Sequence, residues 1–303
     1  MAQKLYDLPF FDLLDKARAI HKENWPECDM QLSTLLNIKT GACPENCAYC
    51  PQSAHFKTGL EKEPLYDKTE VIEAAKKAKE IGSQRFCVGA AWRGPRDDDI
   101  EKVGEMIAEI KAMGLETCAT LGLLKDGQAE KLKEYGLDYY NHNIDTSKEY
   151  YHEIITTRTF QDRIDTINRV RASGLKVCCG GILGMGEKTT DRLNMLVMLA
   201  NMDPYPESVP INKLIPIPGT PMANKVPVSE IEFVKTIAIA RILMPKARVR
   251  LSAGRENMSD SMQTLCFYAG ANSVFYGEKL LTANNSSIDR DNMLFDSLGI
   301  NNG

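Results

Sequence analysis

Apolar residues along the chain follow two alternating spacings. Short apolar runs, such as residues 85–91, have the length and composition of buried β-strands, whereas segments such as residues 100–113 repeat apolar residues at helical spacing and end at a glycine. The pattern predicts eight strands, at residues 32–38, 85–91, 116–121, 137–144, 176–183, 209–215, 249–252 and 273–276. It predicts helices at residues 9–24, 69–81, 100–113, 128–135, 160–172, 190–202, 229–243 and 258–268.

The alternation of strands and helices predicts the fold class. Strand and helix repeat with a period of about 30 residues and are joined by short connections, which indicates parallel strands. Eight such units close a (β/α)8 TIM barrel of the α/β class, whose usual size of ~250 residues suits a chain of 303. The competing open, doubly wound sheet would need a glycine-rich turn after its first strand, where this chain has cysteines. We expect an N-terminal helical extension at residues 1–28, the barrel at residues 29–282, and a polar C-terminal tail at residues 283–303.

Composition and charge narrow the class of protein. Hydrophobic residues make up 43% of the chain and charged residues 26%, which is typical of a folded globular protein. The net charge of −4 argues against nucleic-acid binding, which needs a clustered basic surface. No apolar stretch approaches a membrane span, and the amino terminus lacks a signal-peptide pattern. We therefore expect a soluble, cytoplasmic protein that binds neither nucleic acid nor membranes.

Cysteines supply the main candidate chemistry. The chain has nine, many for a reducing compartment where disulfides are not the default, so metal binding or burial must explain them. Cys43, Cys47 and Cys50 follow the first expected strand, and thiolates at this spacing can converge on an iron–sulfur cluster or zinc. A structural zinc site needs four ligands, whereas a four-iron cluster held by three thiolates leaves one iron open. A zinc knuckle or a disulfide pair is the alternative, although no fourth Cys or His follows at finger spacing and His55 has no partner histidine.

The spacing of these three cysteines, with the aromatic Tyr49 before the last, resembles the signature of the radical S-adenosylmethionine (SAM) superfamily. The resemblance implies that the open iron of a [4Fe-4S] cluster binds SAM. Reductive cleavage of SAM then gives a 5′-deoxyadenosyl radical that abstracts hydrogen from unactivated carbon.

Cysteines on other expected strands indicate a second site. Cys87, Cys118 and Cys178 lie within the second, third and fifth strands, where each side chain can point into the barrel. Taken singly, each is more simply a small buried hydrophobe, but three on separate strands of one barrel favour a metal site. Because Cys178 and Cys179 are adjacent, only one of them can face inward.

Polar and glycine-rich stretches predict a ligand site at the carboxyl ends of the strands. Asn141, Asn143 and Asp145 alternate along the fourth strand, and burying them on one face costs stability unless a polar ligand faces them. The fifth strand ends in a run containing Gly180, Gly181, Gly184 and Gly186. Such glycines let backbone groups approach a cofactor closely, so this run is a candidate SAM site.

Together these motifs make the chain similar to the biotin synthase family over about residues 29–282. The resemblance rests on the cysteine motif, the glycine run, Tyr139-Tyr140-Asn141-His142-Asn143-Ile144-Asp145, Val249-Arg250-Leu251-Ser252-Ala253-Gly254-Arg255-Glu256, Ala269-Gly270-Ala271-Asn272-Ser273 and Tyr276-Gly277. It implies a homodimeric sulfurtransferase that inserts sulfur between C6 and C9 of dethiobiotin, the last step of biotin biosynthesis. It also implies an external one-electron reductant of the flavodoxin or ferredoxin type and an iron–sulfur assembly machinery as partners.

The resemblance also implies roles for individual residues. The [4Fe-4S] cluster corresponds to Cys43, Cys47 and Cys50, and a [2Fe-2S] cluster that serves as sulfur source corresponds to Cys87, Cys118, Cys178 and Arg250. Dethiobiotin corresponds to Asn143 and Asn212, and SAM to Tyr49, Asn143, Asp145, Arg163, Gly180 and Gly181. Cys28, Cys179 and Cys266 match no functional position and are expected to be structural. On general grounds Arg250 is a charge partner or a barrel-lining donor, because a guanidinium stays protonated, and its ligand role comes from the resemblance alone.

Two other functions compete with this interpretation. One is another radical SAM barrel, such as an enzyme that rearranges an amino acid, which would lack the interior cluster. Cys87, Cys118 and Cys178 argue against that reading. The other is a non-catalytic protein that holds zinc through Cys43, Cys47 and Cys50, which would be colourless and free of labile sulfide.

Overall fold

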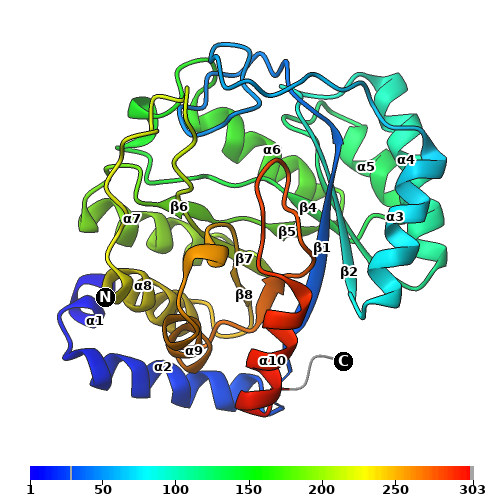
Figure 1. Ribbon diagram of the computed structural model, residues 1–303. Helices are drawn as coiled ribbons and strands as arrows, with labels where there is room; N and C mark the ends of the chain where they lie inside the picture. The colour runs from blue at the N-terminus through cyan, green and yellow to red at the C-terminus, as the bar shows by residue number, and fades with distance from the viewer. Residues whose placement is uncertain (28, 301–303) are drawn as a thin grey trace.

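The computed structural model, which describes residues 1–27 and 29–300, folds its strands into one parallel barrel (Figure 1). The strands are β1 (Gln31–Lys39), β2 (Arg85–Ala90), β3 (Glu116–Thr120), β4 (Tyr139–Asn141), β5 (Lys176–Cys178), β6 (Gly181–Leu183), β7 (Ser208–Lys213), β8 (Arg248–Leu251) and β9 (Ser273–Phe275). They are ordered β5-β4-β3-β2-β1-β9-β8-β7-β6, and a β5–β7 pairing closes the ring. Because β5 and β6 are two halves of one interrupted strand, the barrel has eight strand units, which confirms the (β/α)8 prediction over an open sheet.

Helices cover the outside of the barrel (Figure 1). They are α1 (Ala2–Tyr6), α2 (Phe10–Asn24), α3 (Lys68–Glu80), α4 (Asp97–Ala112), α5 (Gln128–Glu134), α6 (Phe160–Ala172), α7 (Thr189–Ala200), α8 (Glu230–Leu243), α9 (Asp260–Tyr268) and α10 (Ile288–Leu298). Each long helix turns an apolar stripe inward; in α4 the buried stripe includes Ile100, Val103 and Ile107. No helix in the described part of the chain is long and apolar enough to cross a membrane.

The fifth strand is broken where a continuous strand was expected at residues 176–183. Gly180 and Gly181 lie at the break, and neither position has room for a side chain. A Cβ on Gly180 would lie 1.9 Å from the carbonyl oxygen of Pro210, and one on Gly181 would lie 2.6 Å from that of Asp145. These glycines therefore allow close approach between neighbouring strand ends.

Several helix boundaries differ from the sequence prediction by one to three residues, and one short helix was not predicted. Helix α3 begins at Lys68 with Asp67 as its N-cap, rather than at Thr69, because the carboxylate of Glu70 accepts a hydrogen bond from the Asp67 N–H at 3.0 Å. Helix α1 was not expected, because five residues are too few for a helical periodicity to be recognised.

The segment after Asn284 is not the polar surface tail that its composition suggested. It contains α10, whose Leu294 and Phe295 are buried, and Asp291 of this helix forms an ion pair with Arg255 in which neither side chain is exposed. The loop between β9 and α10 rises toward the end of the barrel that holds the cysteine loop (Figure 1). Residues 280–283 of this loop form part of the wall around the site.

Candidate functional site

A cavity of about 330 Å³ lies in the barrel below the loop that follows β1. Most of the residues that the sequence singled out line it: Cys43, Cys47, Tyr49, Cys50, Cys87, Cys118, Asn143, Asp145, Arg163, Asn212 and Arg250. Cys178, Gly180 and Gly181 lie outside its lining. One cavity thus joins the cysteine loop at the mouth to strand residues in the interior.

The cysteine loop is shaped by its own backbone. Its first turn uses positive φ angles at Gly41 (69°) and Ala42 (54°), and it folds back through hydrogen bonds from the Cys43 N–H to the Gln52 carbonyl (3.0 Å) and from the Ala54 N–H to the Cys43 carbonyl (2.8 Å). These contacts hold the loop over the barrel rather than letting it extend into solvent.

The three thiols of this loop are free and sheltered. Burial raises the pKa of Cys43 and of Cys47, and raises that of Cys50 to about 12, so binding a metal here would release protons. In the described part of the chain no three Cys, His, Asp or Glu side chains are arranged to hold a single metal ion. In a multi-iron cluster, by contrast, each thiolate binds a different iron.

Tyr49, Asp145 and Arg163 form a buried polar group beside this loop. The Tyr49 hydroxyl donates to Asp145 Oδ2 at 2.8 Å, and Arg163 Nη2 donates to the same oxygen. Arg163 also donates to the Asn143 carbonyl (2.6 Å) and the Tyr151 hydroxyl (2.9 Å). Each of its three nitrogens donates one of these bonds, and Nη1 and Nη2 each carry a second N–H that remains for another acceptor.

The residues expected along the fourth strand only partly belong to it. β4 ends at Asn141, so Asn143 and Asp145 lie in the loop beyond, and Asp145 has a φ of 66°. A non-glycine residue in this left-handed region is uncommon and is found at functional sites. Here it allows the Asp145 carbonyl to accept from the Ile182 N–H at 2.8 Å while its side chain lines the cavity.

Asn143 and Asn212 are both held by backbone groups of the interrupted fifth strand. Asn143 Oδ1 accepts from the Gly180 N–H (3.0 Å), and Asn212 Nδ2 donates to the Gly181 carbonyl (3.0 Å). No hydrogen bond within the described residues uses the Nδ2 of Asn143. The two glycines thus orient the two asparagine side chains that line the cavity, and their place beside a cofactor stays a prediction.

The interior cysteines meet because their strands are in register. Cys87 of β2 pairs directly with Cys118 of β3, and Cys178 of β5 pairs with Asn141 of β4. The three thiols pack together with Tyr139, apart from the main hydrophobic core. Cys179 packs in that main core instead, so Cys178 is the member of the adjacent pair that faces inward.

Electrostatics distinguish the interior thiols from those at the mouth. Hydrogen bonding with Cys118 lowers the pKa of Cys87, and lowers that of Cys178 to about 6, with further help from Arg250 and Arg85. The same hydrogen bonds raise the pKa of Cys118. Two guanidinium groups thus favour thiolate, the form that binds iron, in a fully buried place.

Arg250 lies among neutral partners below the cysteines. Its Nε donates to Ser273 Oγ (3.0 Å) and its Nη2 to Ser33 Oγ (3.0 Å), and its guanidinium lies 4.8 Å from the centre of the Phe275 ring. Only 1% of the residue is exposed, and no ion pair to a carboxylate is found for it within residues 1–27 and 29–300. Its charge is therefore available to the thiolates, which fits the charge-partner reading made from general chemistry.

Sequence reasoning missed two groups at the site. Arg85 lies two residues before Cys87 on β2, so the strand period places it on the same inward face; its guanidinium sits 3.7 Å from the centre of the Tyr139 ring. Asn141, which the alternating polar run had singled out, lines the cavity with a buried Oδ1 that has no partner among the described residues. In the sequence, only the alternation of side chains along the strand indicated that Arg85 faces the interior.

The second missed group, Arg158 with Glu45, left no such signal. Arg158 comes from the loop before α6, and its Nη2 lies 3.6 Å from the Cys47 sulfur. Glu45 lies inside the cysteine motif itself but reads there as an ordinary polar loop residue. Contacts across more than 100 residues of chain leave no pattern in a single sequence.

Comparisons with known proteins agree with this geometry. The family model of the radical SAM superfamily matches residues 37–200, and that of the biotin and thiamin synthesis associated domain matches residues 210–301. The chain is 61% identical to the biotin synthase of Neorickettsia sennetsu, covering 99% of this chain and 92% of that protein. It is 60% identical to the biotin synthase of Rickettsia felis (99% and 97% covered) and 57% identical to that of Paracidovorax citrulli (99% and 84%).

Solved structures of more distant proteins share the fold. Methylornithine synthase superposes with a TM-score of 0.84 at 19% identity, covering 100% of this chain and 93% of the other. The FeFe-hydrogenase maturase HydG from Carboxydothermus hydrogenoformans superposes with a TM-score of 0.80 at 20% identity, covering 94% and 70%. At these identities the likeness establishes the barrel architecture.

Proposed function

The chain belongs to the biotin synthase family of the radical SAM superfamily, and from this membership we infer that its barrel cavity inserts sulfur between C6 and C9 of dethiobiotin to form biotin. It is accordingly a sulfurtransferase that uses SAM and iron–sulfur chemistry. The observation that carries this conclusion is the similarity to biotin synthases over nearly the full chain. The cavity agrees with it, because cysteines line it both at the mouth and in the interior of the barrel.

We assign Cys43, Cys47 and Cys50 to a [4Fe-4S] cluster at the mouth of the cavity. The donor set fits, because the three thiols are free and line one cavity. When bound, this cluster together with SAM supplies the radical chemistry that abstracts hydrogen from unactivated carbon. The chain's own part is to hold the three thiols at the mouth of one cavity, free of disulfides.

We assign Cys87, Cys118, Cys178 and Arg250 to a [2Fe-2S] cluster that serves as the sulfur source. Support comes from the lowered pKa of Cys87 and of Cys178, and from the positive charges of Arg85 and Arg250, which offset the charge of several thiolates. No hydrogen bond within the described residues uses the Nη1 of Arg250, which leaves that nitrogen for the ligand role implied by the family.

We place SAM and dethiobiotin between the cysteines at the mouth and those in the interior of the barrel. Asn143 and Asn212 are proposed to contact the ureido ring of dethiobiotin, and the unpartnered Oδ1 of Asn141 offers a further acceptor for its N–H groups. Tyr49, Asp145 and Arg163, with Asn143, are proposed to contact SAM, and Gly180 and Gly181 support that site by orienting Asn143 and Asn212. Leu35 and Phe275 make part of the wall apolar, which excludes water and holds the reactants in line.

The proposed partners follow from the reaction. An external one-electron reductant of the flavodoxin or ferredoxin type must supply electrons, and an iron–sulfur assembly machinery must restore the sulfide that the product removes. We further propose that the protein acts as a homodimer, as the family resemblance implies.

The first test is the iron and acid-labile sulfide content per chain, with an absorption spectrum, after anaerobic reconstitution. About six irons, the sum of the two cluster types, support both assignments. About four irons would keep radical SAM chemistry but contradict the interior cluster and the sulfur source. Zinc without labile sulfide would contradict both clusters.

A further inference from the structure

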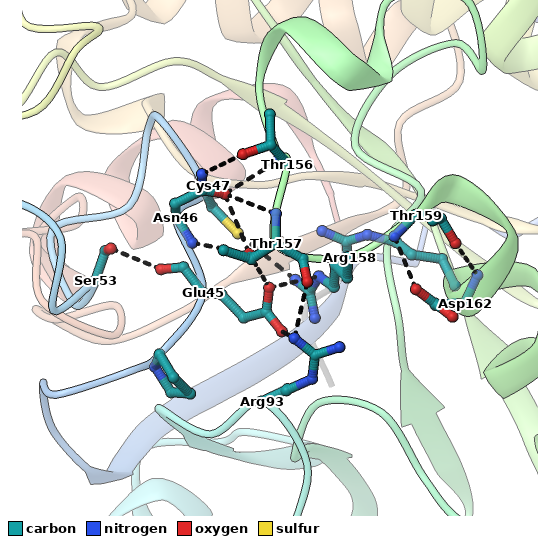
Figure 2. A network of polar contacts seen from close by, with 12 residues as sticks. Glu45, Asn46, Cys47, Ser53, Arg93, Thr156, Thr157, Arg158, Thr159 and Asp162 are labelled. Atoms are coloured by element: carbon teal, nitrogen blue, oxygen red, sulfur yellow. Dashed lines mark hydrogen bonds and ion pairs between the residues drawn. The ribbon is translucent and has the colours of Figure 1, made fainter.

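We propose that Arg158 is a positioning residue for the cluster at the mouth. Its guanidinium, held by the buried carboxylate of Glu45, donates a hydrogen bond to the Cys47 sulfur and makes the bound cluster easier to reduce. This rests on the proposed assignment of Cys43, Cys47 and Cys50 to a [4Fe-4S] cluster. Figure 2 shows the contacts that carry it.

The contact between Arg158 and Cys47 is buried. Nη2 of Arg158 lies 3.6 Å from Sγ of Cys47, within the range of a hydrogen bond to sulfur, and only 9% of the Arg158 side chain is exposed. Arg158 lines the cavity, and its Nε has no hydrogen-bond partner among the described residues. A guanidinium stays charged in proteins, so it brings both a donor and a positive charge to this sulfur.

Glu45 explains why the guanidinium lies there. Only 2% of the Glu45 side chain is exposed, and a buried carboxylate costs stability unless it is paired. Its Oε2 accepts from the Thr157 hydroxyl and lies 3.8 Å from Arg158 Nε, while its Oε1 lies 3.3 Å from Arg93 Nη1 (Figure 2). The carboxylate thus attracts Arg158 to the loop that carries Cys47.

Further hydrogen bonds join the two loops and set the distance between Arg158 and Cys47. Asn46 Oδ1 accepts from the N–H groups of Thr156 (2.9 Å) and Thr157 (3.2 Å), and the Ala48 N–H donates to the Ile154 carbonyl (2.9 Å). The residues just before Arg158 in the chain are therefore fixed to the loop that carries Cys47.

Helix α6 begins immediately after Arg158. Thr159 Oγ1 accepts from the Asp162 N–H at 3.1 Å, and Asp162 Oδ2 accepts from the Thr159 N–H at 2.7 Å, so the helix start is capped (Figure 2). The backbone that carries Arg158 is thereby anchored to a long helix of the barrel wall.

The charges around Cys47 give the direction of the effect. Arg93 and Arg158 face one carboxylate, that of Glu45, and nearby Arg163 is paired with Asp145, so the group as a whole is positive. Reduction adds an electron to the cluster, and a positive charge with an N–H donor at a ligand sulfur stabilises the reduced form. Arg158 therefore helps an external donor to deliver its electron.

The test compares Arg158→Met with the matched control Arg93→Met, which removes a guanidinium from the other side of Glu45 without a contact to sulfur. The reconstituted proteins, without SAM, are poised at fixed potentials, and the reduced cluster is quantified by its EPR signal. We expect R158M to lower the ratio of reduced to oxidised cluster about tenfold, and R93M to change it by less than about twofold. An unchanged ratio in R158M, or an equal change in R93M, would overturn the proposal.

A second measurement covers the case in which R158M does not bind iron. Wild-type protein labelled with ¹⁵N-arginine should show a nitrogen coupling to the reduced cluster in pulsed EPR, and Arg158→Lys should lose it. No coupling in the wild type, or the same coupling in R158K, would contradict the hydrogen bond. Wild-type protein without a four-iron cluster would instead contradict the cluster assignment itself.

Discussion

At the scale of single residues, the adjacent cysteines of the fifth strand unit show how side-chain direction decides chemistry. Cys178 faces the interior, where the hydrogen bond with Cys118 and the guanidiniums of Arg250 and Arg85 lower its pKa to about 6. Cys179 faces the opposite way into the main core, where burial raises its pKa. Of these two neighbouring residues, Cys178 has a thiol suited to metal binding, whereas the Cys179 thiol only packs in the core.

Cys118 and Cys179 form a matched pair for testing the interior cluster. We expect Cys118→Ala to retain about four irons and SAM cleavage but to form no biotin, because Cys118 links the other two interior thiols. Cys179→Ala should keep biotin formation within about threefold of wild type, since that thiol packs outside the cavity. Single-turnover biotin assays on the reconstituted proteins decide between these outcomes. Biotin formation by C118A at the wild-type rate would show that Cys118 is only a packing residue.

Cys47 tests the cluster at the mouth. Cys47→Ala removes one of three thiols that a four-iron cluster needs, so 5′-deoxyadenosine formation should fall to background. Cys266→Ala, a change at a buried cysteine of α9 far from the loop in sequence, is the control that should keep it. Formation of 5′-deoxyadenosine at the wild-type rate by C47A would contradict the assignment.

At the scale of elements, α10 is attached to the barrel by a buried ion pair. Asp291 accepts from both terminal nitrogens of Arg255, whose Nη1 also donates to Gln263 at 2.8 Å and whose Nη2 donates to the Phe275 carbonyl at 3.0 Å. Phe275 ends β9 and lines the cavity, so the ion pair connects the last helix to the wall of the site.

Asp291→Ala should therefore be strongly destabilising. It leaves Arg255 buried without its counter-charge, which costs about 3–5 kcal/mol in the free energy of unfolding. Asp296→Ala, at an exposed position of the same helix, should change it by less than about 0.5 kcal/mol. Urea denaturation of both variants measures the difference, and similar values for the two would show that the ion pair contributes no net stability.

At the scale of the whole molecule, stability should depend on pH through two histidines. Burial, with the charges of Arg241 and Arg18, lowers the pKa of His21 to about 4, and burial also lowers the pKa of His142. In the unfolded chain both have a pKa near 6.5, so below that pH the unfolded state binds more protons than the folded state. The folded state therefore loses stability as the pH falls from about 6.5 toward 4.

Urea denaturation of the metal-free protein at pH 7 and pH 5 tests this expectation. We expect a lower free energy of unfolding at pH 5, with up to about 3 kcal/mol available from His21 over the whole window. His21→Gln should flatten the slope, whereas His152→Gln, at a mostly exposed side chain, should leave it unchanged. Equal stability of the wild type at the two pH values would contradict the buried-histidine explanation.

The sequence by itself determined the barrel and the chemistry of its mouth. Apolar periodicity is local, so it located nearly every strand and helix, and three cysteines close together in one loop need no tertiary information to be recognised. The alternation of side chains along a strand likewise placed Cys87, Cys118 and Cys178 in the interior of the barrel. The same alternation places Arg85 on the inward face of its strand, although the sequence analysis did not use it for that residue.

Tertiary structure alone decided which distant residues meet. Arg158 reaches Cys47, and Asp291 reaches Arg255, across stretches of chain that no periodicity connects. Gly180 and Gly181 also permit a close approach to the backbones of Pro210 and Asp145, which the sequence did not indicate. The physical reason is the same in each case. The energetic effect of a buried charge, or of a glycine that lacks a side chain, depends on the neighbours that folding brings next to it.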